Sequence, residues 1–157
     1  HGEKGHVVNT ASIAGLMSGS GSGAYSVAKH GVVRLTEGVY ASLRECKSKL
    51  GATVLCPGVV ATGIFNSERN RPGSSSQARA QSNAAYHKVA QDLYKTAMQP
   101  DQVAEQVLKA VRDEQLYAIT TTAFDDAIRE RMDAILHRRN PKFPDLMTLS
   151  KRDSRRN

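Results

Sequence analysis

Cysteines and long apolar runs are scarce in this chain of 157 residues, and each scarcity excludes a class of protein. The two cysteines, Cys46 and Cys56, are too few and too differently placed for a disulfide framework. No apolar run approaches the roughly 20 residues that a membrane-spanning helix needs, and the first residues show no signal-peptide pattern. The five histidines have no ligand spacing such as i, i+4 beside a carboxylate. We therefore expect a cytoplasmic protein with no metal and no membrane partner.

Negative charge is also in deficit, because the formal net charge is +7. Much of the excess lies near the C-terminal end, where His137 precedes Arg138 and Arg139 and where Lys142, Lys151, Arg152, Arg155 and Arg156 follow. A basic tail can bind phosphates without sequence preference. However, Pro141, Pro144 and the Ser and Asp content indicate a solvated terminus. We expect residues 141–157 to form a basic, flexible tail, and we expect no nucleic-acid partner.

Tyr25 and Lys29 are the most informative pair of residues that the chain does contain. Four residues apart, they lie on one face of a helix, with Cβ atoms roughly 6 Å apart. A free phenol is a poor proton donor or acceptor at neutral pH. A cation beside it favours the phenolate, which is what a general acid/base requires. Alone the pattern is weak, because a solvated Tyr–Lys pair on a helix surface is common.

Two short apolar segments flank this pair, and each ends in small or turn-forming residues. Residues 5–11 form a strand-like segment that reaches Ser12, and residues 52–56 form a second that is closed by Pro57 and Gly58. Taken singly, Ser12 is most simply a strand-end cap and the Pro–Gly pair an ordinary turn. Open parallel sheets, however, bind their ligands at the carboxyl ends of the strands. Serine, tyrosine and lysine therefore form a constellation and not a lone motif.

With these motifs in this order, the chain resembles the short-chain dehydrogenase/reductase family of the classical type. The matching segments are Val-Val-Asn-Thr-Ala-Ser at 7–12, Tyr-Ser-Val-Ala-Lys at 25–29 and Pro-Gly with a following threonine at 57–62. The step of thirteen residues from Ser12 to Tyr25 also agrees with the family. The resemblance is specific from about residue 6 to 62 and looser to about residue 141.

The resemblance implies a role for each residue. Tyr25 would exchange a proton with the substrate oxygen, Lys29 would assist it and bind the nicotinamide ribose, and Ser12 would hold the oxygen. A hydroxyl and a phenol supply two donors to a developing alkoxide, while the hydride belongs to the cofactor. The resemblance thus implies NAD or NADP as cofactor and a small-molecule alcohol or carbonyl substrate. The implied cofactor-binding residues are Thr10, Ala11, Tyr25, Lys29, Pro57, Gly58, Val60 and Thr62.

The chain departs from the family in lacking its glycine-rich strand–turn–helix fingerprint, which holds the cofactor's pyrophosphate. Residues 19–23 are rich in glycine but have no strand directly before them, so we assign them to the rim of a substrate pocket. We expect an α/β fold: the C-terminal part of a Rossmann-like, doubly wound parallel sheet, with the first four strands and their helices missing. Residues 1–140 would form this partial domain. Because such a sheet leaves apolar surface uncovered, we expect the chain alone to be inactive.

Periodicity predicts the remaining elements. Helices are expected over residues 24–47, 84–98, 102–112 and 125–138, and a last strand over 115–120. The residues expected on buried helix faces are Val32, Val33, Leu35, Val39, Tyr40 and Leu43, then Val103, Val107, Leu108 and Val111, then Ile128, Met132, Ile135 and Leu136. The polar residues 64–80 resemble the family's flexible substrate lid.

Two functions from different classes stay open. The first is an NAD(P)-dependent oxidoreductase acting on a secondary alcohol or ketone. The second is a non-catalytic fragment or pseudoenzyme that acts as an oligomerisation or binding module. The helix over residues 24–47 resembles the one that forms a dimer interface in the family, so a homodimer or homotetramer is implied in either case.

Overall fold

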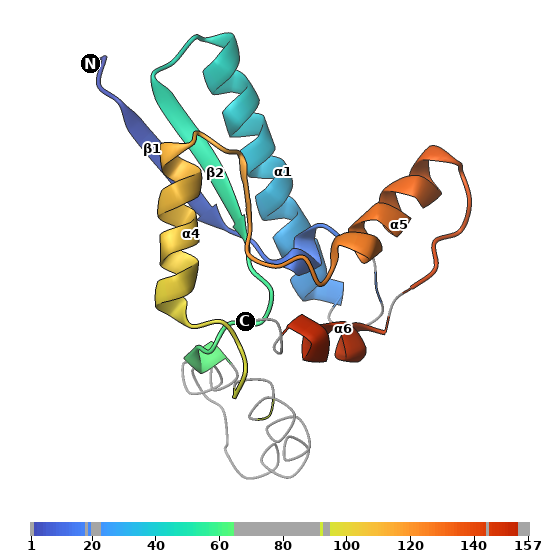
Figure 1. The fold of residues 1–157 in the computed structure, drawn as a ribbon. Coiled ribbons are helices and arrows are strands. Elements are labelled where there is room, and N and C mark those ends of the chain that lie inside the picture. The colour runs from blue at the N-terminus through green and yellow to red at the C-terminus, as the bar shows by residue number, and fades with distance from the viewer. Residues whose placement is uncertain are drawn as a thin grey trace, which may run out of the picture.

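A parallel β-sheet forms the centre of the protein (Figure 1). The computed structural model describes residues 2–17, 19, 23–64, 92, 95–143 and 145–153. Within these residues the sheet has three strands, β1 (Gly5–Thr10), β2 (Leu50–Cys56) and β3 (Tyr117–Ile119), in the order β1-β2-β3. All pairs are parallel, so the carboxyl ends of the strands lie at one edge of the sheet. The predicted α/β class with a parallel sheet is confirmed.

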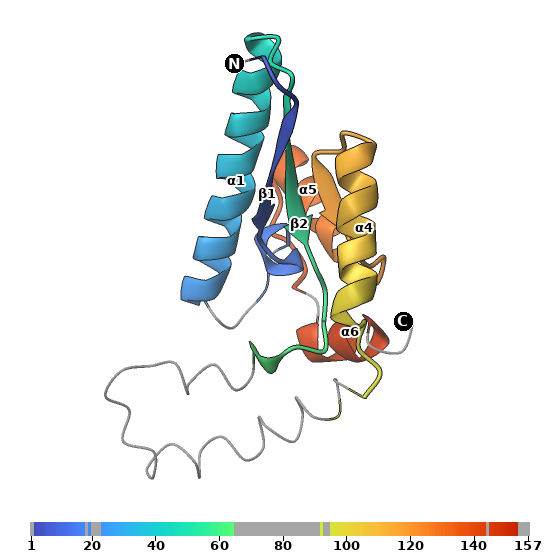
Figure 2. The ribbon, with the colours of Figure 1, turned by 90° about the vertical axis from the view of Figure 1, so that its left-hand side faces the viewer.

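One long helix covers each face of the sheet, and Figure 2 shows the strands between them. Helix α1 (Gly23–Glu45) buries Val33 against Val54 of β2. Helix α4 (Pro100–Arg112) buries Val103 on the opposite face, against Leu55. Because β2 lies between both helices, its last five residues are all buried, as expected for a strand in a doubly wound sheet.

The edge strand β1 is less buried than its apolar sequence would favour. Val7 is 45% exposed and Val8 39% exposed, because no other described strand pairs with the outer edge of β1. Inside the sheet, the buried hydroxyl of Thr53 joins three segments. It donates to the carbonyl of Gln115 at 2.7 Å, and its oxygen lies 2.7 Å from Nε2 of His6.

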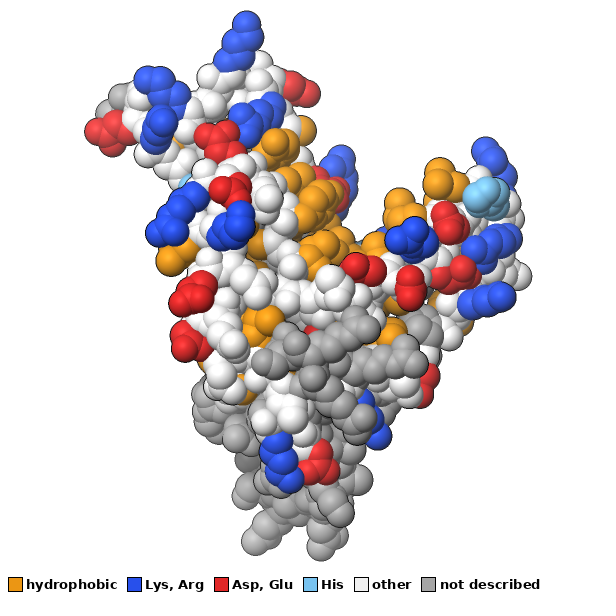
Figure 3. Space-filling view, in the orientation of Figure 1, with side chains coloured by type: hydrophobic (Ala, Val, Ile, Leu, Met, Phe, Trp, Pro, Cys, Tyr) orange, Lys and Arg blue, Asp and Glu red, His pale blue; other side chains and the backbone are white. Residues whose placement is uncertain are grey.

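Helix α5 (Asp125–Leu136) lies away from the sheet, and the space beside it is apolar. Its buried residues are Ala127 and Ala134, whereas Met132, Ile135 and Leu136 are exposed. The predicted buried face of this helix is therefore wrong for these three residues, and Ile128 is only partly buried. A groove of about 490 Å³ separates α5 from α1 and β3. Figure 3 shows hydrophobic side chains gathered in this groove.

The predicted burial is also wrong for two leucines, Leu35 and Leu108. Leu35 is 63% exposed although it was expected in the buried stripe of α1. It lies two residues from Val33, which is about 200° around the helix axis, so both cannot face the sheet. Leu108 of α4 is exposed for the same reason, since it lies two residues from the buried Ala110.

Some predicted segments lie outside the described residues. These are residues 65–80 of the expected lid and most of the expected helix over 84–98. The described residues 95–98 form a turn and an isolated bridge from Met98 to Val60. A short helix that the sequence did not predict, α6 (Leu146–Asp153), lies within the range expected to form a basic tail. No described helix has both the length and the apolarity to cross a bilayer.

Candidate active site

Ser12 lies just past the carboxyl end of β1, where a short helical turn, η1 (Ile13–Gly15), begins. Its Oγ accepts a hydrogen bond from the Ala14 amide at 3.2 Å, so Ser12 caps this turn. The capping interpretation is therefore correct for the local structure. The hydroxyl proton is not used in that bond, because Oγ is the acceptor, and it stays available to a ligand.

A close backbone contact brings η1 against the helix that carries Tyr25 and Lys29. A Cβ built on Gly15 would lie 2.7 Å from the carbonyl oxygen of Lys29. No side chain fits in that space, so glycine is what permits the approach. The segment after Ser12 is thereby fixed beside the first turns of α1.

Tyr25 and Lys29 lie on the same face of α1, one turn apart. The Lys29 ammonium is 5.6 Å from the centroid of the Tyr25 ring, within the range of a cation–π contact. It also donates a hydrogen bond to the Thr10 carbonyl at 3.2 Å. Lys29 thus links the tyrosine to the end of β1. The Tyr25 side chain is 41% exposed, which leaves the phenol accessible.

The Pro57–Gly58 turn follows β2 and lies next to the serine segment. The Ala11 amide donates to the Leu55 carbonyl at 2.8 Å, and the Ile13 amide donates to the Pro57 carbonyl at 3.0 Å. These two bonds extend the β1–β2 pairing beyond the strands. They hold Ser12 and the turn side by side at the carboxyl edge of the sheet.

All the residues that the sequence singled out line one cavity of about 290 Å³ at this edge. They are Thr10, Ala11, Ser12, Tyr25, Lys29, Pro57, Gly58, Val60 and Thr62. The structure therefore brings the three motifs together, with a hydroxyl, a phenol and an ammonium around a small space. A site with these groups can hold an oxygen atom, exchange a proton with it and stabilise negative charge on it.

Sequence reasoning missed part of the cavity wall. Leu55, Ile64, Pro100 and Val103 also line it. The sequence indicates ordinary core positions for Leu55 and Val103, because both lie on apolar faces of their elements. For Pro100 the sequence indicates only the start of a helix, because proline is common at the first helical position. Nothing in the local sequence marks these residues as ligand-facing.

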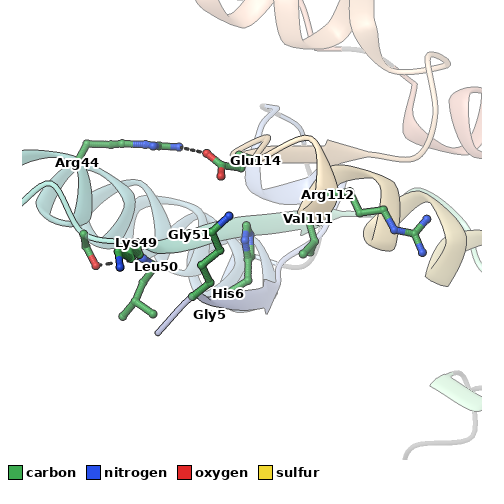
Figure 4. A pocket seen from close by; sticks show the side chains of 11 residues that line it. Gly5, His6, Arg44, Lys49, Leu50, Gly51, Val111, Arg112 and Glu114 are labelled. Atoms are coloured by element: carbon green, nitrogen blue, oxygen red, sulfur yellow. Dashed lines mark hydrogen bonds and ion pairs between the residues drawn. The ribbon is translucent and has the colours of Figure 1, made fainter. Parts of the chain in front are cut away.

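A second cavity, of about 520 Å³, lies at the opposite end of the sheet (Figure 4). Its lining includes Lys4, Arg44, Lys49 and Arg112. Arg44 pairs with Glu114 at 3.2 Å, and the Lys49 ammonium donates to a backbone carbonyl at 3.0 Å. Helices α1 and α4 both end here, and their exposed carbonyls attract cations. Arg44 and Arg112 lie in the last turns of these helices, and Ser12, Tyr25 and Lys29 do not line this cavity.

Comparisons with known proteins agree with this geometry. The sequence model of the short chain dehydrogenase family matches residues 1–73. The chain is similar to a CLA biosynthesis dehydrogenase/reductase of Lactiplantibacillus plantarum, with 27% identity over 135 residues, which cover 83% of this chain and 47% of that protein. It is also similar to a C alpha-dehydrogenase of Sphingobium sp., with 27% identity over 135 residues, covering 86% of this chain and 44% of that protein.

Among solved structures, the chain resembles a short-chain dehydrogenase/reductase from Burkholderia phymatum in complex with NAD. The two are 36% identical, with a TM-score of 0.78, and the match covers 91% of this chain and 52% of that one. The chain spans about half the length of the curated relatives it matches. The family match includes Ser12, Tyr25, Lys29 and the Pro57–Gly58 turn. Residues 1–73 thus match the short chain dehydrogenase family, and over 91% of its length the chain is similar to a short-chain dehydrogenase/reductase of known structure.

Proposed function

We propose that this chain carries the catalytic end of an oxidoreductase that transfers a hydride between NAD or NADP and a secondary alcohol or ketone. The observation that supports it is the single cavity around which Ser12, Tyr25 and Lys29 meet the Pro57–Gly58 turn. The cofactor, when bound, supplies or accepts the hydride, and the protein binds, orients and moves a proton.

Each polar group in the cavity has a distinct task in this proposal. The Tyr25 hydroxyl gives a proton to the substrate oxygen in reduction and removes it in oxidation. Lys29, held between the Tyr25 ring and the Thr10 carbonyl, stabilises negative charge that develops on the phenol and on the substrate. The Ser12 hydroxyl donates a second hydrogen bond to the same substrate oxygen.

The cavity fits one end of a dinucleotide and not the whole. Its volume of about 290 Å³ lies at the lower end of the roughly 300–1,000 Å³ of sites that take drug-sized ligands. Thr62 and the Pro57–Gly58 turn would hold the nicotinamide, with Val60 as an apolar surface for its ring. The pyrophosphate and the second nucleotide must lie outside this cavity. The choice between NAD and NADP is therefore not made by these residues.

Replacing Tyr25 by phenylalanine in the full-length protein tests the proposal. We expect turnover of a secondary alcohol to fall by about 10²–10⁴-fold, the range that one general acid/base supplies, with an unchanged melting temperature. Tyr40→Phe is the matched control, because Tyr40 lies on the same helix beside Arg44, at the far end from the cavity. Equal turnover in Tyr25→Phe and wild type would refute the role of the phenol.

We also propose that the chain of 157 residues on its own does not turn over substrate. Its acid/base groups are assembled, but the described residues offer only the nicotinamide end of a cofactor site. Titration of this chain with NAD and NADP, followed by calorimetry, tests the statement. Micromolar binding of either nucleotide would contradict the incomplete cofactor site on which this proposal rests.

For the partner, we propose a second copy of this chain against the outward face of α1. Leu35, Val39 and Leu43 line a shallow apolar groove there, beside Gly31 and Gly38. Such a face favours close helix packing, which also supports the non-catalytic alternative, an oligomerisation module. Light scattering on Leu35→Arg should report a smaller particle than wild type, whereas Leu136→Arg, equally exposed on α5, should not. A dimer without turnover in the wild-type protein would favour the module.

A further inference from the structure

Helix α6 (Leu146–Asp153) lies below the carboxyl ends of the strands, next to the candidate active site (Figures 1 and 2). Leu149 packs against the apolar cluster that contains Ile13, Met17 and Phe124. Ile13 directly follows Ser12 in the chain. One face of α6 is therefore anchored on the serine segment.

Asp153 lies one turn after Leu149 and so on the same face of α6. Its side chain has no exposed surface, and its Oδ2 accepts a hydrogen bond from the Val59 amide at 2.7 Å. Burying an acidic side chain is costly unless hydrogen bonds compensate for the lost water. The burial of Asp153 therefore indicates a specific contact with the Pro57–Gly58–Val59 turn.

The Pro57–Gly58 turn is shaped to receive this carboxylate. A Cβ built on Gly58 would overlap Oδ2 of Asp153 and would lie 2.9 Å from its Cγ. The Gly58 amide is also used, since it donates to Thr120 Oγ at 3.3 Å. Two consecutive amides of the turn are thus bound by side chains from the C-terminal third of the chain. Gly58 and its neighbours Pro57 and Val60 at the same time line the cavity.

We propose that Asp153 is a positioning residue that fixes the Pro57–Gly58–Val59 turn and thereby the surface on which the nicotinamide binds. The inference rests on the proposed function, because it concerns how the cofactor end of that cavity is held. Lys29 contacts the Tyr25 ring and the Thr10 carbonyl, whereas the carboxylate of Asp153 binds the Val59 amide of the turn. Loss of the carboxylate should therefore weaken cofactor binding much more than it slows the proton transfer.

The experiment compares Asp153→Ala and Asp153→Asn in the full-length protein by amide hydrogen exchange and by steady-state kinetics. In Asp153→Ala we expect the Val59 amide to exchange at least about tenfold faster, since a hydrogen bond to a charged acceptor is worth that much or more. We expect KM for the nicotinamide nucleotide to rise about tenfold, with kcat changed less than about threefold. Asp153→Asn keeps an acceptor oxygen and should rescue most of the exchange protection.

Thr148→Val is the matched control on the same helix, because Thr148 is exposed and its hydroxyl donates to Asp145 at 2.6 Å, away from the Val59 amide. It should leave the Val59 amide and KM unchanged. If the Asp153→Ala protein does not fold, Asp153→Ser gives the same comparison of Val59 exchange with and without the carboxylate. The serine side chain is too short to reach the Val59 amide.

Unchanged exchange at Val59 in a folded Asp153→Ala protein would overturn the proposal, and so would an unchanged KM. The exchange measurement needs no cofactor. If the wild-type protein has no turnover, the proposed function fails, whereas the exchange comparison still decides whether Asp153 holds the turn.

Discussion

Replacing Gly58 by alanine should destabilise the protein, although the same substitution is usually mild. The added Cβ would lie 2.8 Å from Thr121 Cγ2 and 2.9 Å from Asp153 Cγ, whereas ordinary contacts begin at 3.4 Å. The turn cannot keep its place against both neighbours. Either the Asp153 side chain leaves the Val59 amide or the turn moves into the cavity.

The size of the effect follows from these contacts. Losing the hydrogen bond from Val59 to a carboxylate costs about 1.5–3 kcal/mol, and the overpacking at Thr121 costs about 1–3 kcal/mol. Alanine returns about 0.5–1 kcal/mol by restricting the unfolded chain. The free energy of unfolding should therefore fall by about 1.5–5.5 kcal/mol, with similar contributions from the contacts at Asp153 and at Thr121.

Urea denaturation of the full-length protein measures this change. Gly23→Ala is the matched control: a Cβ there meets nothing within 4 Å, Gly23 does not line the proposed interface, and alanine at the start of α1 should not lower the stability. The effect of Gly58→Ala should shrink by more than about 1 kcal/mol in an Asp153→Ala background, because the two residues share one contact. A stability of Gly58→Ala within about 0.5 kcal/mol of wild type, well below that range, would refute the reasoning.

Three further predictions concern buried or paired groups elsewhere. Thr53→Val removes the hydroxyl that joins three segments and should lower the free energy of unfolding by about 1–3 kcal/mol. Thr53→Ser keeps the hydroxyl and should cost only the buried methyl group, about 0.5–1.5 kcal/mol. Iodoacetamide at pH 8 should label Cys46 and spare Cys56 in the folded protein. Burial raises the pKa of the Cys56 thiol to about 11, so about one Cys56 side chain in a thousand is a thiolate at pH 8. Equal labelling of the two cysteines by mass spectrometry would contradict this. Burial, together with the bond to Glu37, raises the pKa of Tyr117 from 10.0 to about 12, so the stability from this bond is complete below pH 10 and lost as pH rises towards 12. Urea midpoints of Tyr117→Phe should lack this part of the alkaline loss.

Strong local patterns made much of the fold predictable. The apolar run at 52–56 lies in β2, and the long periodic segment at 24–47 covers all of α1 (Gly23–Glu45) except its first residue. Periodicity reports which face of a helix is apolar, not whether another element covers that face. This is why Met132 and Ile135 were expected to be buried, although the groove beside α5 leaves them exposed.

Helix α6 was not predictable from its own residues. It is eight residues long, too short to be stable through propensity alone, and prolines precede it. Its stabilising contacts are distant in sequence: 94 residues separate Asp153 from Val59. The same limit applies within the site. The motifs identified Ser12, Tyr25 and Lys29, but only the structure shows that Gly15 permits their segments to meet.

The contacts that hold Ser12 and Lys29 do not depend on the open edge of β1. Ser12 is held by the bonds from Ala11 and Ile13 to the β2 side, and Lys29 by the Thr10 carbonyl. Val7 and Val8, the exposed apolar residues of β1, do not line the cavity. The proposed inactivity of the chain alone would then follow from a cofactor site that, among the described residues, holds only the nicotinamide end, and not from a collapsed catalytic geometry. The two causes are separable, because only the first leaves the Lys29–Tyr25 contact intact in the isolated chain.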